Sequence, residues 1–205
     1  MENKTYRDGK YTLIKADIFF NIDKTEMISH FYYPEKYIFM TNALGESKVY
    51  YPDNNEVFLA QNEVLSAEKN MLYYFISNQI FDLGIESLGF FVDETKFEEN
   101  LQVTIWKPLP DMPSKVGKVK LVHENGIPIY MSYFNTSDVI SNKVYFNNYQ
   151  VMYEFMIPAD ITEITYVTDV DSIVSKISYS GLKYGHEANS EFFDFKIPED
   201  AKIIE

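Results

Sequence analysis

The sequence contains no cysteine and a single arginine, Arg7, among its 205 residues. The lack of cysteine excludes disulfide bonds, thiolate metal sites and cysteine nucleophiles, although it does not identify a cellular compartment. The formal net charge is −13, which disfavours nucleic acid as a partner because phosphate recognition depends on clustered Lys and Arg. The same charge disfavours adsorption to anionic membranes.

Long apolar runs and common catalytic motifs are also missing. No segment approaches the roughly 18 apolar residues that would span a membrane, and the first eight residues lack the apolar core of a signal peptide. We therefore expect either a cytosolic protein or a chain whose leader has been removed. The sequence has no G-x-S-x-G elbow, Walker loop or dinucleotide fingerprint, so it predicts neither an enzyme nor a cofactor.

Aromatic residues are abundant, and they favour strands over helices. Phe, Tyr and Trp make up 17% of the chain, and aromatic side chains fit the pleated surface of a sheet. The stretch from Ile28 to Ala60 illustrates the pattern, because turn signals at Pro34, Gly45 and Pro52 separate four runs rich in Tyr, Phe and Val. It predicts a meander of four antiparallel strands.

The rest of the chain indicates the same class of fold. Asn125-Gly126 between two apolar runs is a strong hairpin signal, and a last strand is expected at Glu191 to Ile197. No repeat of 20 to 50 residues occurs. We predict a flexible segment at residues 1–10, followed by one mostly β domain over residues 11–205.

One segment has helical rather than β periodicity. Between Ser66 and Phe81 the apolar positions are spaced as on one face of a helix; they are Met71, Leu72, Phe75, Ile76 and Ile80. Ser66 is the expected N-cap and Gly84 the expected stop. Periodicity alone fits two roles for such a helix. It either fills the core or forms a lid over an apolar ligand cavity.

The ionisable residues show no pattern that is typical of a metal or catalytic site. His30, His123 and His186 are far apart in sequence and lack the spacing of metal ligands. Asp93 to Glu99 is interpreted as a solvated charged loop rather than an acid-base pair. Asp169 and Asp171 lack the further oxygen ligands that calcium requires. No metal site is predicted.

Several segments resemble the lipoprotein-carrier family of LolA and LolB. Tyr33 to Phe39 reads YPEKYIF and Gly45 to Asp53 reads GESKVYYPD, similar to the family's R-P-x-x-F-x-W and D-G-x-x-[LV]-W-x-Y-[DN]-P segments. Ile105 to Pro108 and the ending from Phe193 to Ile203 resemble later family segments. The motifs occur in the family's order between Leu13 and Ile204.

The resemblance implies a fold and a function. The fold would be a curved, incomplete antiparallel β-barrel of about eleven strands with a helical lid. The function would be non-catalytic transport or sensing of lipoprotein acyl chains, or of other lipid, by a periplasmic monomer that exchanges cargo with an inner- or outer-membrane protein. One departure stands out. The arginine that holds the family's lid closed is replaced by Tyr33, whose hydroxyl lacks the charge of a guanidinium.

Six residues are predicted to line the cargo cavity. Leu72, Phe75 and Ile76 would come from the helix, and Tyr33, Phe39 and Trp106 from the sheet. Two other functions stay open from sequence alone. One is a protein-interaction module of a cell-envelope assembly that docks through exposed tyrosines. The other is a glycan-binding or hydrolytic β-sandwich with paired carboxylates on a concave face.

Overall fold

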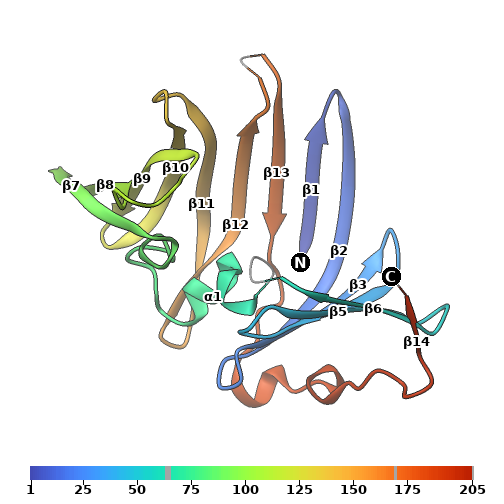
Figure 1. The fold of residues 1–205 in the computed structure, drawn as a ribbon. Helices are drawn as coiled ribbons and strands as arrows, with labels where there is room; N and C mark the ends of the chain where they lie inside the picture. The colour runs from blue at the N-terminus through green and yellow to red at the C-terminus, as the bar shows by residue number, and fades with distance from the viewer. Residues whose placement is uncertain (63–65, 169, 205) are drawn as a thin grey trace.

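The computed structural model describes residues 1–62, 66–168 and 170–204. Within these ranges, fourteen strands form one sheet that curves into an open half-barrel (Figure 1). The strands are β1 (Glu2–Arg7), β2 (Lys10–Asn21), β3 (Glu26–Tyr33), β4 (Tyr37–Thr41), β5 (Glu46–Tyr51), β6 (Glu56–Gln61), β7 (Phe90–Glu98), β8 (Leu101–Pro108), β9 (Val116–Glu124), β10 (Ile127–Asn135), β11 (Ile140–Met152), β12 (Phe155–Tyr166), β13 (Ser172–Ser178) and β14 (Lys202–Ile204). The prediction of a mostly β, curved and incomplete barrel is confirmed.

Two meanders meet at the centre of the sheet. The strand order is β14-β6-β5-β4-β3-β2-β1-β13-β12-β11-β10-β9-β8-β7. The first meander runs outward from β1 to β6, and the second starts at the far edge with β7 and returns to place β13 beside β1. Neighbouring strands are antiparallel except for β14, which pairs parallel to β6. β7 and β14 remain as the two edges, so the barrel does not close.

The connection between β6 and β7 carries helix α1 (Met71–Ile76) across the concave face of the sheet (Figure 1). Short 3₁₀ turns flank it at η2 (Ala67–Lys69) and η3 (Glu86–Leu88). The main core lies between α1 and strands β8 to β12. Its most deeply buried large side chains are Phe75, Ile85, Trp106, Leu121, Met131, Phe146 and Ile157. None of the described helices is long and apolar enough to cross a membrane.

A second, smaller core lies on the opposite face of β3 to β6. After β13 the chain passes through η4 (Gly185–Ala188) and η5 (Glu191–Asp194) beneath these strands (Figure 1). There the side chains of the carboxyl-terminal segment cover the outer face of the sheet. Phe192, Phe195 and Ile197 pack against Ile38, Tyr50 and Val57. The outer face of the aromatic meander is therefore covered by the carboxyl-terminal segment, and its other face belongs to the concave side of the sheet.

Two turn-based predictions are confirmed. The four-strand meander is present as β3 to β6, with each strand paired antiparallel to the next. Asn125 and Gly126 connect β9 to β10, and both have positive φ, 51° and 81° respectively. Two consecutive positive φ values define the type I′ turn that suits the twist of a hairpin.

The prediction of a flexible segment at residues 1–10 is wrong. Glu2–Arg7 forms β1, which pairs with β2 on one side and β13 on the other. The side chains of β1 do not belong to the main core, so the strand can be polar. This polar sequence is what led to the prediction of a flexible segment. Ladder hydrogen bonds on both edges hold the strand, together with ion pairs of Glu2 with Lys4 (2.9 Å) and Lys15 (3.1 Å).

The helix is shorter than the predicted span from Ser66 to Phe81. Its N-cap is Asn70, whose side chain accepts a hydrogen bond from the Leu72 amide at 2.9 Å, whereas Ser66 makes no side-chain cap. The helix ends at Ile76 because Asn78 turns to a φ of +56°. Asn accepts this left-handed conformation more readily than most residues, so the stop comes six residues before Gly84.

The predicted last strand at Glu191 to Ile197 is also wrong. Glu191–Asp194 forms the 3₁₀ turn η5, which begins where the Ser190 hydroxyl accepts a hydrogen bond from the Phe192 amide at 3.3 Å. The apolar positions Phe192 and Phe195 lie three residues apart, a spacing that a 3₁₀ turn places on one side. The true last strand is β14, which begins at Lys202.

Candidate functional site

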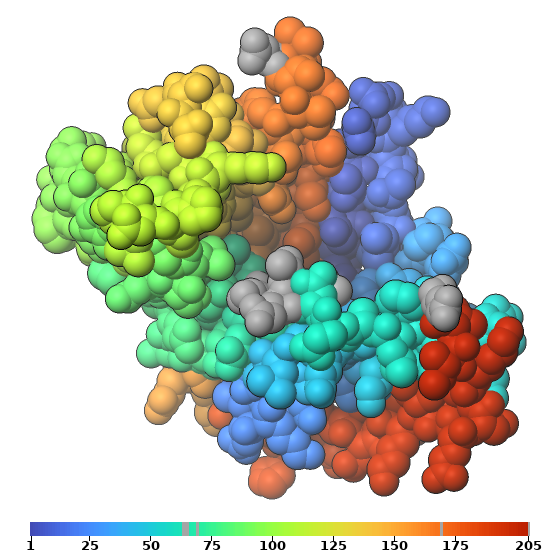
Figure 2. All heavy atoms as spheres, viewed as in Figure 1, coloured from blue at the N-terminus to red at the C-terminus, as the bar shows by residue number. Residues whose placement is uncertain are grey.

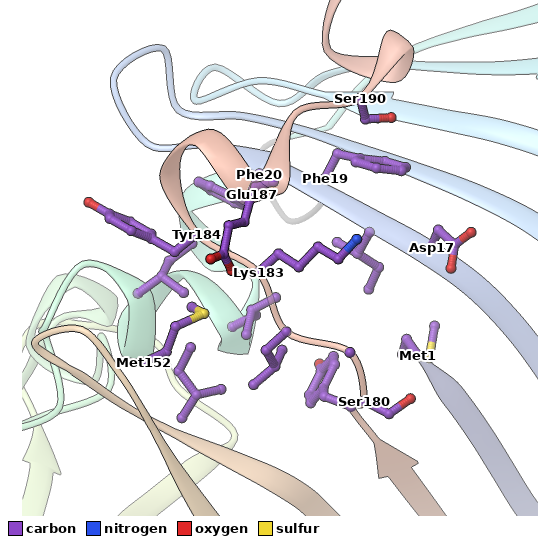
Figure 3. Close-up of a pocket in the computed structure, with 18 of the residues that line it drawn as sticks. Met1, Asp17, Phe19, Phe20, Met152, Ser180, Lys183, Tyr184, Glu187 and Ser190 are labelled. Atoms are coloured by element: carbon purple, nitrogen blue, oxygen red, sulfur yellow. The ribbon is translucent and has the colours of Figure 1, made fainter.

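A cavity of about 440 Å³ lies between α1, β2 and the segment that follows β13 (Figure 3). This volume is within the range of small-molecule sites. Apolar side chains form most of its walls: Ile18, Phe19, Phe20, Ile22, Leu72, Ile76, Met152, Ile157, Leu182 and Phe193. Such a lining favours an apolar ligand, because the surface that each partner buries is removed from water.

Helix α1 contributes two residues of one face to the cavity wall. Leu72 and Ile76 are four residues apart, so they lie on one face of α1, and both line the cavity. Phe75 points elsewhere, into the main core, where its ring meets the edges of Phe146 and Tyr149 with centroids 5.5 and 6.1 Å away. The core side of α1 thus anchors the helix while the other side faces the cavity.

The segment after β13 forms the opposite wall. Tyr179 continues the sheet by donating its amide hydrogen to the Ala159 carbonyl at 2.7 Å, and burial raises the pKa of its phenol to about 12. Farther along, the Tyr184 ring contacts Tyr153 and Phe155 of the β11–β12 hairpin, with centroids 4.8 and 5.6 Å apart. These contacts position the wall without filling the cavity.

Ionisable groups occupy part of the cavity lining. Asp17, Lys183 and Glu187 all line it, and Figure 3 shows the Lys183 side chain extending toward β2. Within the described residues, no ion pair involves Lys183 or Glu187. A second, more open hollow of about 590 Å³ shares Phe20, Lys183 and Tyr184 with the cavity. The site therefore combines an apolar interior with a polar margin that opens to solvent.

The structure brings together two of the six predicted cargo residues, Leu72 and Ile76, as cavity lining. Phe75 and Trp106 are buried in the main core. Trp106 donates from Nε1 to the Thr104 hydroxyl at 3.1 Å, and its ring meets the edge of Phe81. Both residues support the cavity from behind, since they hold α1 and the following loop on the sheet.

Tyr33 and Phe39 lie outside this cavity. Phe39 is partly buried on β4, opposite Ser29 of β3 and Val49 of β5. Strand alternation puts it on the concave face, because Ser29 pairs with Ile18, a residue that contacts the main core. Tyr33 ends β3 and is 49% exposed. Sequence reasoning missed the wall that the carboxyl-terminal segment forms. Phe193 falls within Glu191 to Ile197, which was interpreted as a strand, and Leu182 was not singled out.

The three histidines lie in separate places in the fold, and none of them shares a site with another. His123 is buried, with Nε2 2.9 Å from the Ile80 carbonyl oxygen, and burial lowers its pKa. His30 stacks on Phe192, with centroids 4.5 Å apart. His186 lies in η4 and lines the second hollow. The described residues contain no group of three His, Cys, Asp or Glu side chains that could hold a metal ion.

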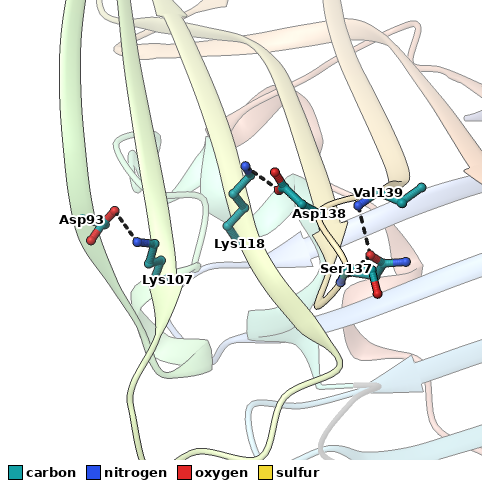
Figure 4. A network of polar contacts seen from close by, with 7 residues as sticks. Asp93, Lys107, Lys118, Ser137, Asp138 and Val139 are labelled. Carbon is teal, nitrogen blue, oxygen red and sulfur yellow. Dashed lines mark hydrogen bonds and ion pairs between the residues drawn. The ribbon is translucent and has the colours of Figure 1, made fainter.

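The remaining carboxylates do not converge on the cavity. Asp93 to Glu98 belongs to the exposed edge strand β7 rather than to the loop that was predicted. The alternating charged side chains of an edge strand mimic a charged loop in sequence, and one of them, Asp93, pairs with Lys107 at 2.9 Å (Figure 4). Asp169 of the weak calcium motif is outside the described residues.

Comparison with known proteins identifies solved structures that share the fold of this chain. No protein-family model matches the sequence, and no curated protein matches it. Among solved structures, a LolA superfamily protein from Nitrosomonas europaea aligns with a TM-score of 0.54 at 11% identity, over 85% of this chain and 80% of its own. A structure from Vibrio parahaemolyticus, described as a putative outer membrane lipoprotein-sorting protein domain, aligns with a TM-score of 0.51 at 11% identity. The alignment covers 89% of this chain and 84% of the other.

A DUF1329 family protein from Desulfovibrio piger aligns with a TM-score of 0.50 at 13% identity, over 89% of this chain and 85% of its own. At identities this low the alignments show a shared fold. The chain has the LolA-like open half-barrel.

Proposed function

We propose that this protein is a non-catalytic carrier or sensor that binds acyl chains, of lipoproteins or of other lipids, in the cavity beneath α1. The observation that carries the proposal is the largely apolar cavity between α1, β2 and the segment after β13. The LolA-like fold supports it, because two of the similar structures are described as a LolA superfamily protein and a lipoprotein-sorting domain. In this proposal the protein acts as a monomer in the periplasm and exchanges cargo with a membrane protein.

The physical basis is burial of hydrocarbon. Each CH₂ group that leaves water contributes about 0.8 kcal/mol, and side chains such as Leu72, Ile157 and Leu182 provide non-directional contacts. Non-directional binding tolerates different chain lengths and permits release, because no single strong bond has to break. The polar end of the cargo would remain at the margin, near Asp17, Lys183 and Glu187.

A titration with fatty acids of increasing length tests the proposal. We expect saturable binding from octanoate to dodecanoate, with affinity rising about fourfold per CH₂ until the cavity is full. Isothermal titration calorimetry below the critical micelle concentration measures this series. A flat series, or one without saturation, would contradict the proposal.

A matched pair of variants locates the binding. Ala188 lines the cavity, whereas Ala60 lies on β6 outside it. Ala188→Trp should fill the cavity and weaken dodecanoate binding at least tenfold, and Ala60→Trp should leave the affinity within twofold. Circular dichroism confirms that both variants are folded. Equal effects of the two substitutions would place the cargo elsewhere on the sheet.

A further inference from the structure

The concave face has a polar zone at the end opposite the cavity. Along the strands, the apolar row that includes Phe146, Ile161 and Ile177 is followed by a row that includes Glu163, Ser175 and Thr5, which are register partners on β12, β13 and β1. Glu163 is six residues along β12 from Ile157 of the cavity, or about 20 Å at the rise of a strand. Figure 2 shows that the concave side of the molecule is hollowed, with orange residues at the back of the hollow.

The hydrogen-bond donors of Asn142 and Ser175 are bonded to other side chains of this zone. The Asn142 amide donates to the Glu163 carboxylate at 2.6 Å and to the Thr165 hydroxyl at 3.0 Å. The Ser175 hydroxyl donates to Asn3 Oδ1 at 2.8 Å. One carboxylate oxygen of Glu163 accepts from Asn142, while no hydrogen bond within the described chain is assigned to the other. The zone therefore presents acceptors.

Glu163 also lacks a cationic partner. Among the described residues, no ion pair includes it, although it is partly buried. The lysines of the neighbouring strands, Lys143 and Lys176, alternate to the convex face. Arg7 shares the concave face, but its guanidinium pairs with Asp8 at 3.6 Å. A partly buried carboxylate without a counter-charge attracts an external cation.

Tyr133 gives the zone an aromatic side. It lies on β10 in register with Asn142, and burial together with the charge of Glu163 raises the pKa of its phenol to about 12. The phenol therefore stays neutral at physiological pH. A neutral aromatic ring beside a carboxylate is a favourable setting for an ammonium group, which gains from both the charge and the ring.

We propose that Glu163, held by Asn142 and flanked by Thr165 and Tyr133, binds a primary ammonium group in the hollow of the concave face. Acceptors and a negative charge reject anions and favour a donor with three N–H groups. The chemistry is that of an alkylammonium, which occurs both in amine-bearing head groups of lipids and in small polyamines. The site is separate from the cavity beneath α1 and can be tested independently of it.

The test is a calorimetric titration with n-hexylammonium at low ionic strength, alongside n-hexanol and hexanoate as matched probes. We expect saturable binding of n-hexylammonium, and Glu163→Gln should weaken it at least tenfold because the amide keeps the shape but loses the charge. Glu98→Gln, on exposed β7, is the control and should change the affinity less than twofold. Glu163→Asp, which retains the charge but shortens the reach, should give an intermediate affinity.

The two sources of the ammonium group are distinguished by spermidine. Tighter binding of n-hexylammonium than of spermidine indicates an amphiphile, and the reverse indicates a polyamine. Binding of n-hexylammonium that is unchanged in Glu163→Gln, or equally weakened in Glu98→Gln, would overturn the proposal, as would equal binding of n-hexanol and n-hexylammonium. Retained dodecanoate binding in Glu163→Gln shows that the cavity is intact.

Discussion

His123 is a buried ionisable residue that connects the sheet to the loop after α1. Its Nε2 lies 2.9 Å from the Ile80 carbonyl oxygen, its ring stacks near Phe81, and Nδ1 has no partner among the described residues. Burial lowers its pKa below the ordinary value of 6.5. A proton added to Nδ1 would have no acceptor, so the folded protein favours the neutral ring.

This surrounding predicts a pH dependence of stability. Below pH 6.5 the unfolded chain takes up a proton on His123 more readily than the folded chain does, so the stabilisation present above pH 6.5 is lost as the pH falls. We expect the free energy of unfolding to drop between pH 7.5 and 5.5, and to drop less in His123→Gln, which keeps a donor for Ile80. Urea unfolding at both pH values measures this difference. An identical drop in the two proteins would exclude His123 as a cause.

Tyr33 shows what a residue-level resemblance can and cannot predict. The motif Tyr33-Pro34 was correctly assigned to the end of a strand, because proline interrupts strand pairing. Tyr33 was expected to line the cavity as an aromatic residue of the sheet, but alternation does not say which face of a strand points inward. The structure places Tyr33 half exposed at the end of β3. Its contribution to cargo binding stays a prediction.

At the scale of elements, the carboxyl-terminal segment holds the outer face of the first meander. Phe192 stacks on Phe19 and His30, with centroids 5.1 and 4.5 Å apart, and also contacts Phe195. The partners of Phe192 lie on β2, on β3 and directly after η5. One side chain thus links the segment that walls the cavity to the strands beneath it.

Removing this aromatic anchor should destabilise the protein. We expect Phe192→Ala to lower the free energy of unfolding by about 2 kcal/mol, the scale for burying a large apolar side chain. Phe97→Ala is the matched control, because Phe97 is 76% exposed on β7, and it should cost less than about 0.5 kcal/mol. Thermal or urea unfolding compares the two. Equal effects would mean that the segment is not anchored through Phe192.

Elements with strong local signals were predicted well, and those that depend on distant partners were not. The meander and the Asn125-Gly126 hairpin follow from turn chemistry and alternation within a few residues. β1 has a polar sequence and exists because β2 and β13 pair with it. The start of α1 was missed because Asn70 is as good an N-cap as Ser66, so residue type alone does not choose between them. The end of α1 was missed because Asn78 is a weaker stop signal than Gly84. Phe193 was missed as cavity lining because η5 imitates a strand.

At the scale of the whole molecule, the order of the strands creates the cavity. The connection from β6 to β7 has to cross the concave face to reach the far edge, and α1 lies on that crossing (Figure 1). The connection from β13 to β14 passes from the centre of the sheet to its outer face. The cavity forms where these two crossings approach each other, at the ends of β2 and β13. Neither crossing is visible in local sequence patterns.

The most direct measurement of the central claim locates a bound acyl chain. A fatty acid with a nitroxide near its methyl end broadens the NMR signals of methyl groups within its reach. The proposal predicts saturable broadening at Leu72, Ile76, Ile157 and Leu182, which disappears when unlabelled dodecanoate is added. Broadening centred on the concave face of β3 to β6 near Phe39, or broadening without saturation, would contradict it.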